Sequence, residues 1–327
     1  MDSALRLFEL GRSVQNWPIR PAGRNYRDAA LIHKIDELFK RQARAWPQLA
    51  KGVEGLARAK TRAVQIDWFD IFVRHIPHRM RSTTAAVDRE SIAKRPCFLC
   101  AQNLPPEEEG VQFDDSFTIY CNPFPIVDRH LTIAHKEHGS QRIGNQFGNM
   151  LDLAAALPGY FVVYNGPECG ASAPDHLHFQ AGSRELFPIG KDTARMTGLT
   201  VPNYARNVFL FHGHDRSALI DRIDRAIDLL ANATGKRGEP LVNIAVFRER
   251  TQWFTYLFPR GKHRPAAFHT GELTVSPASI DLCGIFVVPL AHDFENITSE
   301  AIAAIFREVT LPDDRFQEVA AKLESER

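Results

Sequence analysis

Two imidazoles and an amide recur at every second position in the segment Asp175-His176-Leu177-His178-Phe179-Gln180. Side chains alternate between the two faces of a β-strand, so a strand here carries His176, His178 and Gln180 on one polar face. The segment follows Cys169-Gly170-Ala171-Ser172-Ala173-Pro174, a turn of small residues whose backbone N–H groups can point at a phosphate. These features predict a half-buried strand with an anion site at its start. The alternative for so short a pattern is a strand whose histidines face the solvent.

The composition predicts a chain that buries a large core. Its 327 residues, 44% of them apolar, exceed the usual size of one domain, so we expect two domains or one duplicated unit. Lys and Arg number 40 and Asp and Glu number 39, and the net charge of +1 gives no general attraction to nucleic acid or to an anionic membrane. A polyanionic ligand therefore needs a local site.

The cysteines and the absence of long apolar stretches predict a cytoplasmic location. No stretch approaches the roughly 20 apolar residues of a membrane span, and residues 1–20 have the pattern of a short amphipathic helix without a signal-peptide core. Five cysteines, two of them in Cys97-Phe98-Leu99-Cys100, suit a reducing compartment. There a CxxC motif more often binds metal or does redox work than forms a structural disulfide.

The N-terminal region, residues 1–92, is expected to form a helical layer that covers the rest of the fold. Apolar residues recur at helical spacing between Ala29 and Trp46. Residues 75–81 combine basic and histidine side chains around a proline, which favours a solvated connector; the alternative is an arm that reaches an anionic ligand.

The remaining chain predicts two related halves. Residues 93–190 have the pattern of a β-β-α-β-β unit, in which we expect Asn122–Ile126 to be one of the extended segments. Residues 191–327 show a similar order and predict a second, degenerate half, with a further strand at Leu273–Ser276. In that parallel, Trp253-Phe254-Thr255-Tyr256 occupies the position of His-Leu-His-Phe in the first half.

Several motifs carry a family resemblance, and in chain order they are Asn122–Ile126, His130–Ile133, Lys136–His138, Asn165, Gly170–Ser172 and His176–Ala181. In these residues the chain resembles the histidine triad superfamily, in particular the branch that includes galactose-1-phosphate uridylyltransferase and the GDP-hexose phosphorylases. The specific likeness covers roughly residues 95–185, and HLHFQA is most similar to the phosphorylases. The resemblance implies an α+β fold with two related halves around an antiparallel sheet, and pairing of subunits as in relatives that form homodimers.

The resemblance implies that His178 is the nucleophile. A neutral imidazole attacks an α-phosphorus readily, and the nucleotidyl-imidazole that forms passes the nucleotide on. Gln180 stands where the hydrolase branch has a third histidine, and an amide supplies no proton. The leaving group should therefore depart without protonation, as a sugar 1-phosphate or a nucleotide phosphate does, which favours phosphorolysis or nucleotide exchange over hydrolysis.

Candidate nucleotide and phosphate ligands surround the motif, and each has a structural alternative. The backbone amides of Gly170 and Ala171 and the amide and hydroxyl of Ser172 would hold phosphate oxygens, unless the segment is an ordinary tight turn. Further candidates are two asparagines that alternatively cap turns, and two cations in a loop that is alternatively a solvated basic turn. These four residues are Asn122, Asn165, Arg260 and Lys262.

The family also implies a metal site. Cys97 and Cys100 would join His138 and His176 in a tetrahedral set of two sulfurs and two nitrogens, which suits zinc and leaves no open position for catalysis. Its role would be structural. Competing ligands are His130 and His135, and two unliganded cysteines are the alternative.

The predicted function is a nucleotidyltransferase or phosphorylase that acts on a nucleoside diphosphate sugar through nucleotidyl-His178 and releases a sugar 1-phosphate. Its partners are the nucleotide sugar and inorganic phosphate or a sugar phosphate. One alternative is a dinucleoside polyphosphate phosphorylase of the diadenosine tetraphosphate type. Another is a zinc-stabilised nucleotide-binding protein without turnover. The motifs specify neither the base nor the sugar.

Overall fold

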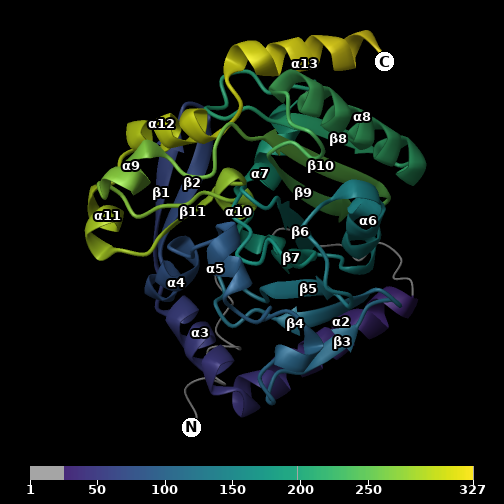
Figure 1. Cartoon of the computed structure of the whole chain (residues 1–327), viewed down its shortest axis with the longest axis vertical. Helices are drawn as coiled ribbons and strands as arrows, with labels where there is room; N and C mark the ends of the chain where they lie inside the picture. Colours follow the sequence, from purple (N-terminus) through teal and green to yellow (C-terminus); the bar gives the residue numbers. More distant parts are fainter. Residues whose placement is uncertain (1–25, 197, 327) are drawn as a thin grey trace.

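One large antiparallel sheet organises the chain in the computed structural model, which describes residues 26–196 and 198–326 (Figure 1). The helix expected at residues 1–20 lies outside the described residues. The sheet has eight strands, in spatial order β3 (Gly110–Gln112), β4 (Phe117–Cys121), β5 (Leu131–His135), β7 (His178–Ser183), β6 (Tyr160–Asn165), β9 (Val242–Glu249), β10 (Gln252–Pro259) and β8 (Phe209–Gly213).

The two halves of the chain meet in the middle of this sheet. The order β5-β7-β6 on one side of the meeting point is repeated as β8-β10-β9 on the other, and β6 and β9 pair antiparallel at the junction. Helix α6 (Phe147–Ala156) connects β5 to β6, and helix α8 (Arg216–Thr234) connects β8 to β9. The second half thus repeats the β-α-β-β part of the first. The predicted α+β fold, with related halves around an antiparallel sheet, is confirmed.

Helix α8 shows how local sequence sets the boundaries of an element. The Asp215 carboxylate accepts the backbone N–H of Ser217 at 2.8 Å and of Ala218 at 3.1 Å, which satisfies amides that have no partner inside the helix. Gly235 ends the helix with φ of 65°, a left-handed conformation that favours glycine. An aspartate before a helical pattern and a glycine after it are signals that the sequence itself carries, and they predict both boundaries.

Each face of the large sheet is covered by a separate layer, and each layer encloses a hydrophobic core. One face packs against α6, α8, α2 (Tyr26–Ala45) and α13 (Asp313–Ser325), over side chains such as Phe179 and Val162. The other face packs against a small sheet of β1 (Lys60–Ile66), β2 (Phe69–His75) and β11 (Ile285–Val288), together with α10 (Ser279–Leu282) and α12 (Ser299–Val309). Burial of one large apolar side chain contributes about 1.5–3 kcal/mol.

Short helices complete the connections between these layers. They are α3 (Pro47–Ala57), η1 (Pro77–Arg79), α4 (Met80–Thr83), α5 (Arg89–Ala93), η2 (Ala101–Asn103), η3 (Gly144–Gln146), η4 (Arg184–Leu186), α7 (Pro188–Asp192), η5 (Thr193–Arg195), α9 (Ala266–Thr270) and α11 (Ala291–Asn296). Within the two described ranges, none of the helices combines the length and the apolar character that crossing a bilayer requires.

Three local predictions differ from the structure. The N-terminal layer is only partly helical, because β1 and β2 form a hairpin that pairs in parallel with β11 from the far end of the chain. Asn122–Ile126 is a loop, since Pro123 and Pro125 lack the N–H that pairing inside a sheet requires. Leu273–Ser276 is irregular rather than a strand.

The connector at residues 75–81 is only partly exposed, and two of its side chains hold the proline-rich loop. The Nε2 of His78 lies 3.0 Å from the carbonyl oxygen of Pro125, and Nη1 of Arg79 donates to Phe124 O at 3.0 Å. Burial lowers the pKa of Arg79 to about 10. Basic side chains of this connector therefore bind a loop that is distant in sequence.

Candidate active site and metal centre

His178 is the first residue of β7, and its ring is held in one tautomer. Its Nδ1 lies 2.8 Å from the carbonyl oxygen of His176, so Nδ1 carries the proton and donates it, which leaves the lone pair on Nε2. The side chain is buried, with 3% of the residue exposed. Burial lowers the pKa of His178 to about 4. At neutral pH the ring is therefore an uncharged imidazole with an unprotonated Nε2.

Gln180 lies two residues further along the same face of β7, and His130 fixes the orientation of its amide. The Nδ1 of His130 accepts the backbone N–H of Ile126 at 3.1 Å, so the ring proton is on Nε2, which donates to Gln180 Oε1 at 2.9 Å. Burial, assisted by the positive charge of Arg79, lowers the pKa of His130 to about 3. Because Oε1 accepts from a neutral His130, the NH₂ group of Gln180 is left to donate elsewhere.

The bend before β7 has the geometry that an anion site needs. Gly170 has φ of 96°, and a Cβ atom there would lie 2.5 Å from Ala278 Cβ, so only glycine fits. The backbone N–H groups of Gly170, Ala171 and Ser172 donate to no acceptor within the residues that the structure describes. Successive amides of this kind bind phosphate oxygens well.

An ion pair anchors the far end of this bend. Arg95 Nη2 donates to Ser172 O at 3.3 Å and to the Asp175 carboxylate at 3.0 Å. Both side chains of the pair are mostly buried, with 26% and 17% exposed. Since Arg95 lies two residues before Cys97, the pair ties the bend to the cysteine motif.

Asn165 braces the bend against the second half. Its Oδ1 accepts from Asn243 Nδ2 at 2.8 Å, from the backbone of Ser279 at 2.9 Å and from the Ser279 hydroxyl at 2.7 Å. Asn243 Nδ2 also donates to Cys169 O at 2.8 Å. The oxygen of Asn165 is therefore fully used, and only its NH₂ group is left for a ligand.

Asn122 caps the proline-rich loop. Its Oδ1 accepts the backbone N–H of Phe124 at 2.9 Å, and its Nδ2 donates to the hydroxyl of Thr132 at 3.0 Å. Thr132 pairs with Gln180 across β5 and β7. The turn-capping alternative thus describes the contacts of Asn122 in this structure.

The structure contradicts the prediction that Arg260 binds phosphate. A guanidinium has five N–H donors, and all of them are used inside the second half. Their acceptors, at 3.1 Å or less, are Val309 O, Asn243 Oδ1, Pro277 O, Lys262 O and His263 O.

Lys262 lies away from the catalytic strand as well. Its ammonium group pairs with Glu308 at 3.0 Å. Together with Arg260 it lines a surface cavity of about 760 Å³, and His178 is not among the residues that line this cavity.

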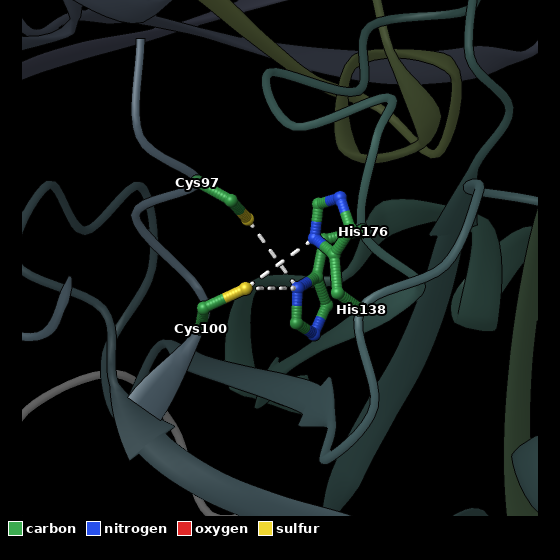
Figure 2. A group of neighbouring side chains, drawn as sticks. All are labelled: Cys97, Cys100, His138 and His176. Carbon is green, nitrogen blue, oxygen red and sulfur yellow. Dashed lines mark hydrogen bonds between the residues drawn. The ribbon is translucent and has the colours of Figure 1, made fainter. Parts of the chain in front are cut away.

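Four predicted metal ligands converge next to β7. Figure 2 shows the sulfurs of Cys97 and Cys100 facing the rings of His138 and His176. The ligand atoms all lie within 4.8 Å of one another. His130 and His135, the competing ligands, are outside this cluster.

The spacing of the four atoms fits a tetrahedral ion. Cys97 Sγ lies 3.3 Å from His176 Nδ1, and Cys100 Sγ lies 3.6 Å from His176 Nδ1 and 3.3 Å from His138 Nδ1. Ordinary zinc–sulfur and zinc–nitrogen bonds at the tetrahedral angle give a sulfur–nitrogen separation of about 3.5 Å. The Nε2 of His176 lies 2.6 Å from His135 O, so it donates there and turns its Nδ1 lone pair toward the cluster. The residues therefore fit zinc.

Known proteins resemble this chain in sequence and in fold. A family model described as a domain of unknown function (DUF4922) matches residues 38–183, and one described as GDPGP1-like, C-terminal domain, matches residues 183–326. Galactose-1-phosphate uridylyltransferase from Bifidobacterium longum subsp. longum is 31% identical over 86 residues. That match spans 25% of this chain and 16% of the uridylyltransferase.

Solved structures of yeast Ap4A phosphorylase Apa2 share the architecture. One of them has a TM-score of 0.58 at 17% identity, and the match covers 88% of this chain and 95% of that chain. The complex with Ap4A has a TM-score of 0.59 at 17% identity, and the match covers 86% of this chain and 98% of that chain. The chain has a histidine triad-like fold, and the predicted family resemblance is confirmed. The two family models meet at residue 183, the last residue of β7, so the strand that carries His178 closes the first matched region.

Several residues of the site carry no recognisable motif in the sequence. Gln141 binds the backbone of His178, while Asn243 and Ser279 hold Asn165 from the second half. Their partners are 37, 78 and 114 residues away along the chain, so no local pattern relates them. Folding of the first half brings Gln141 to His178, and pairing of the two halves brings Asn243 and Ser279 to Asn165.

Proposed function

We propose that this chain is a nucleotidyltransferase of the phosphorylase type that acts on a nucleoside diphosphate sugar through a nucleotidyl-His178 intermediate. One observation carries the proposal. His178 is a neutral imidazole whose Nδ1 proton is held by His176 O, and it stands two residues before Gln180 on β7. This strand follows a bend whose backbone amides have no acceptor within the described residues. The resemblance to GDP-hexose phosphorylases and to a uridylyltransferase supports the reaction class.

In the first step, the Nε2 lone pair of His178 forms a bond to the α-phosphorus, and the bond from that phosphorus to the bridging oxygen breaks. The sugar 1-phosphate leaves with the electron pair. The ring gains positive charge as the bond forms, and the carbonyl oxygen of His176, 2.8 Å from Nδ1, stabilises it. The amides of Gly170, Ala171 and Ser172 would bind the nonbridging oxygens, on which negative charge accumulates.

In the second step, an oxygen of inorganic phosphate attacks the phosphorus, and the bond to His178 Nε2 breaks. The products are a nucleoside diphosphate and the neutral imidazole. Gln180 donates a hydrogen bond through its NH₂ group but transfers no proton, so acceptor and leaving group are both anions that need none. Water, which requires a base, is disfavoured as the acceptor.

A second candidate is a dinucleoside polyphosphate phosphorylase, in which a nucleotide phosphate leaves in place of the sugar phosphate. The fold shared with yeast Ap4A phosphorylase favours it. The same His178 chemistry serves both reactions. A nucleotide-binding protein without turnover is the alternative of another class.

The four-ligand cluster would hold zinc in a structural role, because no ligand position is left open for a substrate. A bound ion would fix His176, whose carbonyl oxygen orients the ring of His178. The reducing compartment that the cysteines favour supports a cytoplasmic enzyme, and pairing as a homodimer follows only from the family resemblance.

The test is a panel of nucleoside diphosphate sugars and dinucleotides, incubated with and without inorganic phosphate. Without phosphate, we expect intact mass spectrometry to show an acid-labile adduct of one nucleoside monophosphate, absent from His178→Ala. With phosphate, a sugar 1-phosphate product supports the first candidate and a nucleoside diphosphate from a dinucleotide supports the second. Tight ligand binding by both proteins, with no adduct, would overturn the enzymatic proposal.

A further inference from the structure

Strand β7 lacks a paired residue of β6 beside His178. Pairing between β6 and β7 runs from Tyr160 with Ser183 to Val163 with Gln180, and it ends before His178. The backbone N–H and C=O of His178 on that side therefore need other partners. A nucleophile whose backbone is unpaired would not be held accurately.

The side chain of Gln141 supplies both missing partners. Its Oε1 accepts the backbone N–H of His178 at 2.8 Å, and its Nε2 donates to His178 O at 3.0 Å and to Asn165 O at 2.9 Å. Gln141 is fully buried, with 0% exposed. One side-chain amide thus stands between the diverging ends of β6 and β7 in place of a strand residue.

Gln141 is itself held from the bend and from the second half. Its backbone N–H donates to Pro174 O at 3.0 Å, and its carbonyl accepts from the Tyr164 hydroxyl at 3.2 Å. The oxygen of that hydroxyl also lies 2.5 Å from Oε1 of Glu239, and the other oxygen of Glu239 accepts the backbone N–H of Ile143 at 2.6 Å. Burial raises the pKa of Glu239. A residue of the degenerate half therefore takes part in holding the catalytic strand.

We propose that Gln141 is a positioning residue for His178, and that the pair Tyr164 and Glu239 locks it in place. This inference rests on the proposed function. Because the ring of His178 bonds to the carbonyl oxygen of His176, two residues earlier in the chain, a shift of this segment moves the whole nucleophile relative to the bend. A misplacement of about 1 Å costs on the order of 100-fold in rate, while the binding contacts of the substrate stay in place.

The experiment compares Gln141→Leu with Gln65→Leu, which removes an exposed glutamine of β1. The substrate is the one that the panel identifies, and the rate of adduct formation and the dissociation constant are measured separately. We expect Gln141→Leu to lower the rate about 100-fold and the affinity less than about threefold. Gln65→Leu should change neither.

Gln141→Glu tests the donor directly. A carboxylate still accepts from His178 N but faces two carbonyl oxygens without a proton, so the rate should be low at pH 7. Protonation restores one donor, and we expect the rate relative to the unmodified protein to recover between pH 7 and pH 5. Glu239→Gln is measured in parallel, because Glu239 and Tyr164 are the titratable groups of the same network. If its pH profile shows the same recovery, the effect belongs to Glu239 and the assignment to Gln141 is wrong.

The outcomes separate the two proposals. No adduct in the unmodified protein overturns the proposed function, whereas a normal adduct rate in a folded Gln141→Leu variant overturns only the role of Gln141. If Gln141→Leu does not fold, the acid recovery of Gln141→Glu decides. The ring N–H resonance of His178 in nuclear magnetic resonance spectra gives a readout without substrate: it should shift in Gln141→Glu and not in Gln65→Leu.

Discussion

Strands β7 and β10 occupy equivalent places in the two halves, yet on the same face of the sheet β7 carries polar side chains and β10 carries aromatic ones. On β7 this face presents His178 and Gln180, and on β10 it presents Phe254, Tyr256 and Phe258, which pack in the core under the small sheet. The stacked rings of Phe247 and Phe254, with centroids 5.1 Å apart, need no polar partners. The same topology therefore supports a strand with polar side chains on this face or a strand with aromatic side chains there.

The difference lies in the partners that surround each strand. On β7, Gln141 binds the backbone of His178 and His130 binds the amide of Gln180, so buried polar groups are paired. The second half contributes Asn243 and Glu239 to this support. Polar groups of one half therefore help to hold a strand of the other half in place.

The largest expected effect tests whether only β7 is reactive. His178→Ala removes the nucleophile and should lower turnover about 10³-fold or more, because no other group forms the intermediate. Tyr256→Phe, on the equivalent strand, should leave turnover within about threefold. Single-turnover kinetics with the substrate from the panel measure both. Equal losses in the two variants would contradict the asymmetry between the halves.

Among the described residues, the candidate metal cluster lies in the half that carries His178, and its loss should be the next largest effect. Cys100→Ser replaces a thiolate ligand with a poor one and should lower zinc affinity at least about tenfold, with a lower unfolding temperature. Cys121→Ala, a buried cysteine outside the cluster, should retain one zinc ion per chain. Elemental analysis and thermal unfolding give the two readouts. Equal zinc contents in both variants would remove the cluster from consideration as the metal site.

The first half also buries a carboxyl away from the site, which should make stability depend on pH. Burial raises the pKa of Glu108 to about 7, above its ordinary value of 4.5, so the folded protein binds a proton that the unfolded chain has released. That stabilisation is complete below pH 4.5 and is lost as the pH rises through 7. Glu108→Gln should match the unmodified protein at pH 4 and exceed it by about 1–3 kcal/mol at pH 8 in urea unfolding. The exposed neighbour Glu107, changed to Gln, is the control.

The smallest expected effect concerns the structural strand. The hydroxyl of Thr255 on β10 is buried and has no hydrogen-bond partner within the described residues. Thr255→Val keeps the shape and removes the unpaired group, so it should stabilise the fold by about 1 kcal/mol without a change in turnover. Denaturant unfolding measures the gain. A loss of stability would show that the hydroxyl is satisfied by water or another group.

Local patterns in the sequence predicted the elements that depend on neighbouring residues. The alternation from His178 to Gln180, the cap at Asp215 and the helix stop at Gly235 each follow from side chains a few positions apart, whereas His176 lies before the strand that was predicted to include it. The CxxC spacing and two distant histidines indicated a metal cluster, and those four side chains do converge. The catalytic roles of His178 and Gln180 are proposals that rest on the geometry of the two side chains.

The sequence could not decide which distant groups form hydrogen bonds with the residues of each motif. Arg260 read as a phosphate ligand, but its five N–H donors are all satisfied by atoms of the second half. No sequence motif marked Gln141, although its side chain binds the backbone of His178. By itself, the sequence determined the alternation, caps and cysteine spacing, because these depend on geometry within a few residues. Only the tertiary structure decided which polar groups are paired and which are free, because a hydrogen bond between residues far apart in the chain exists only after the halves have packed.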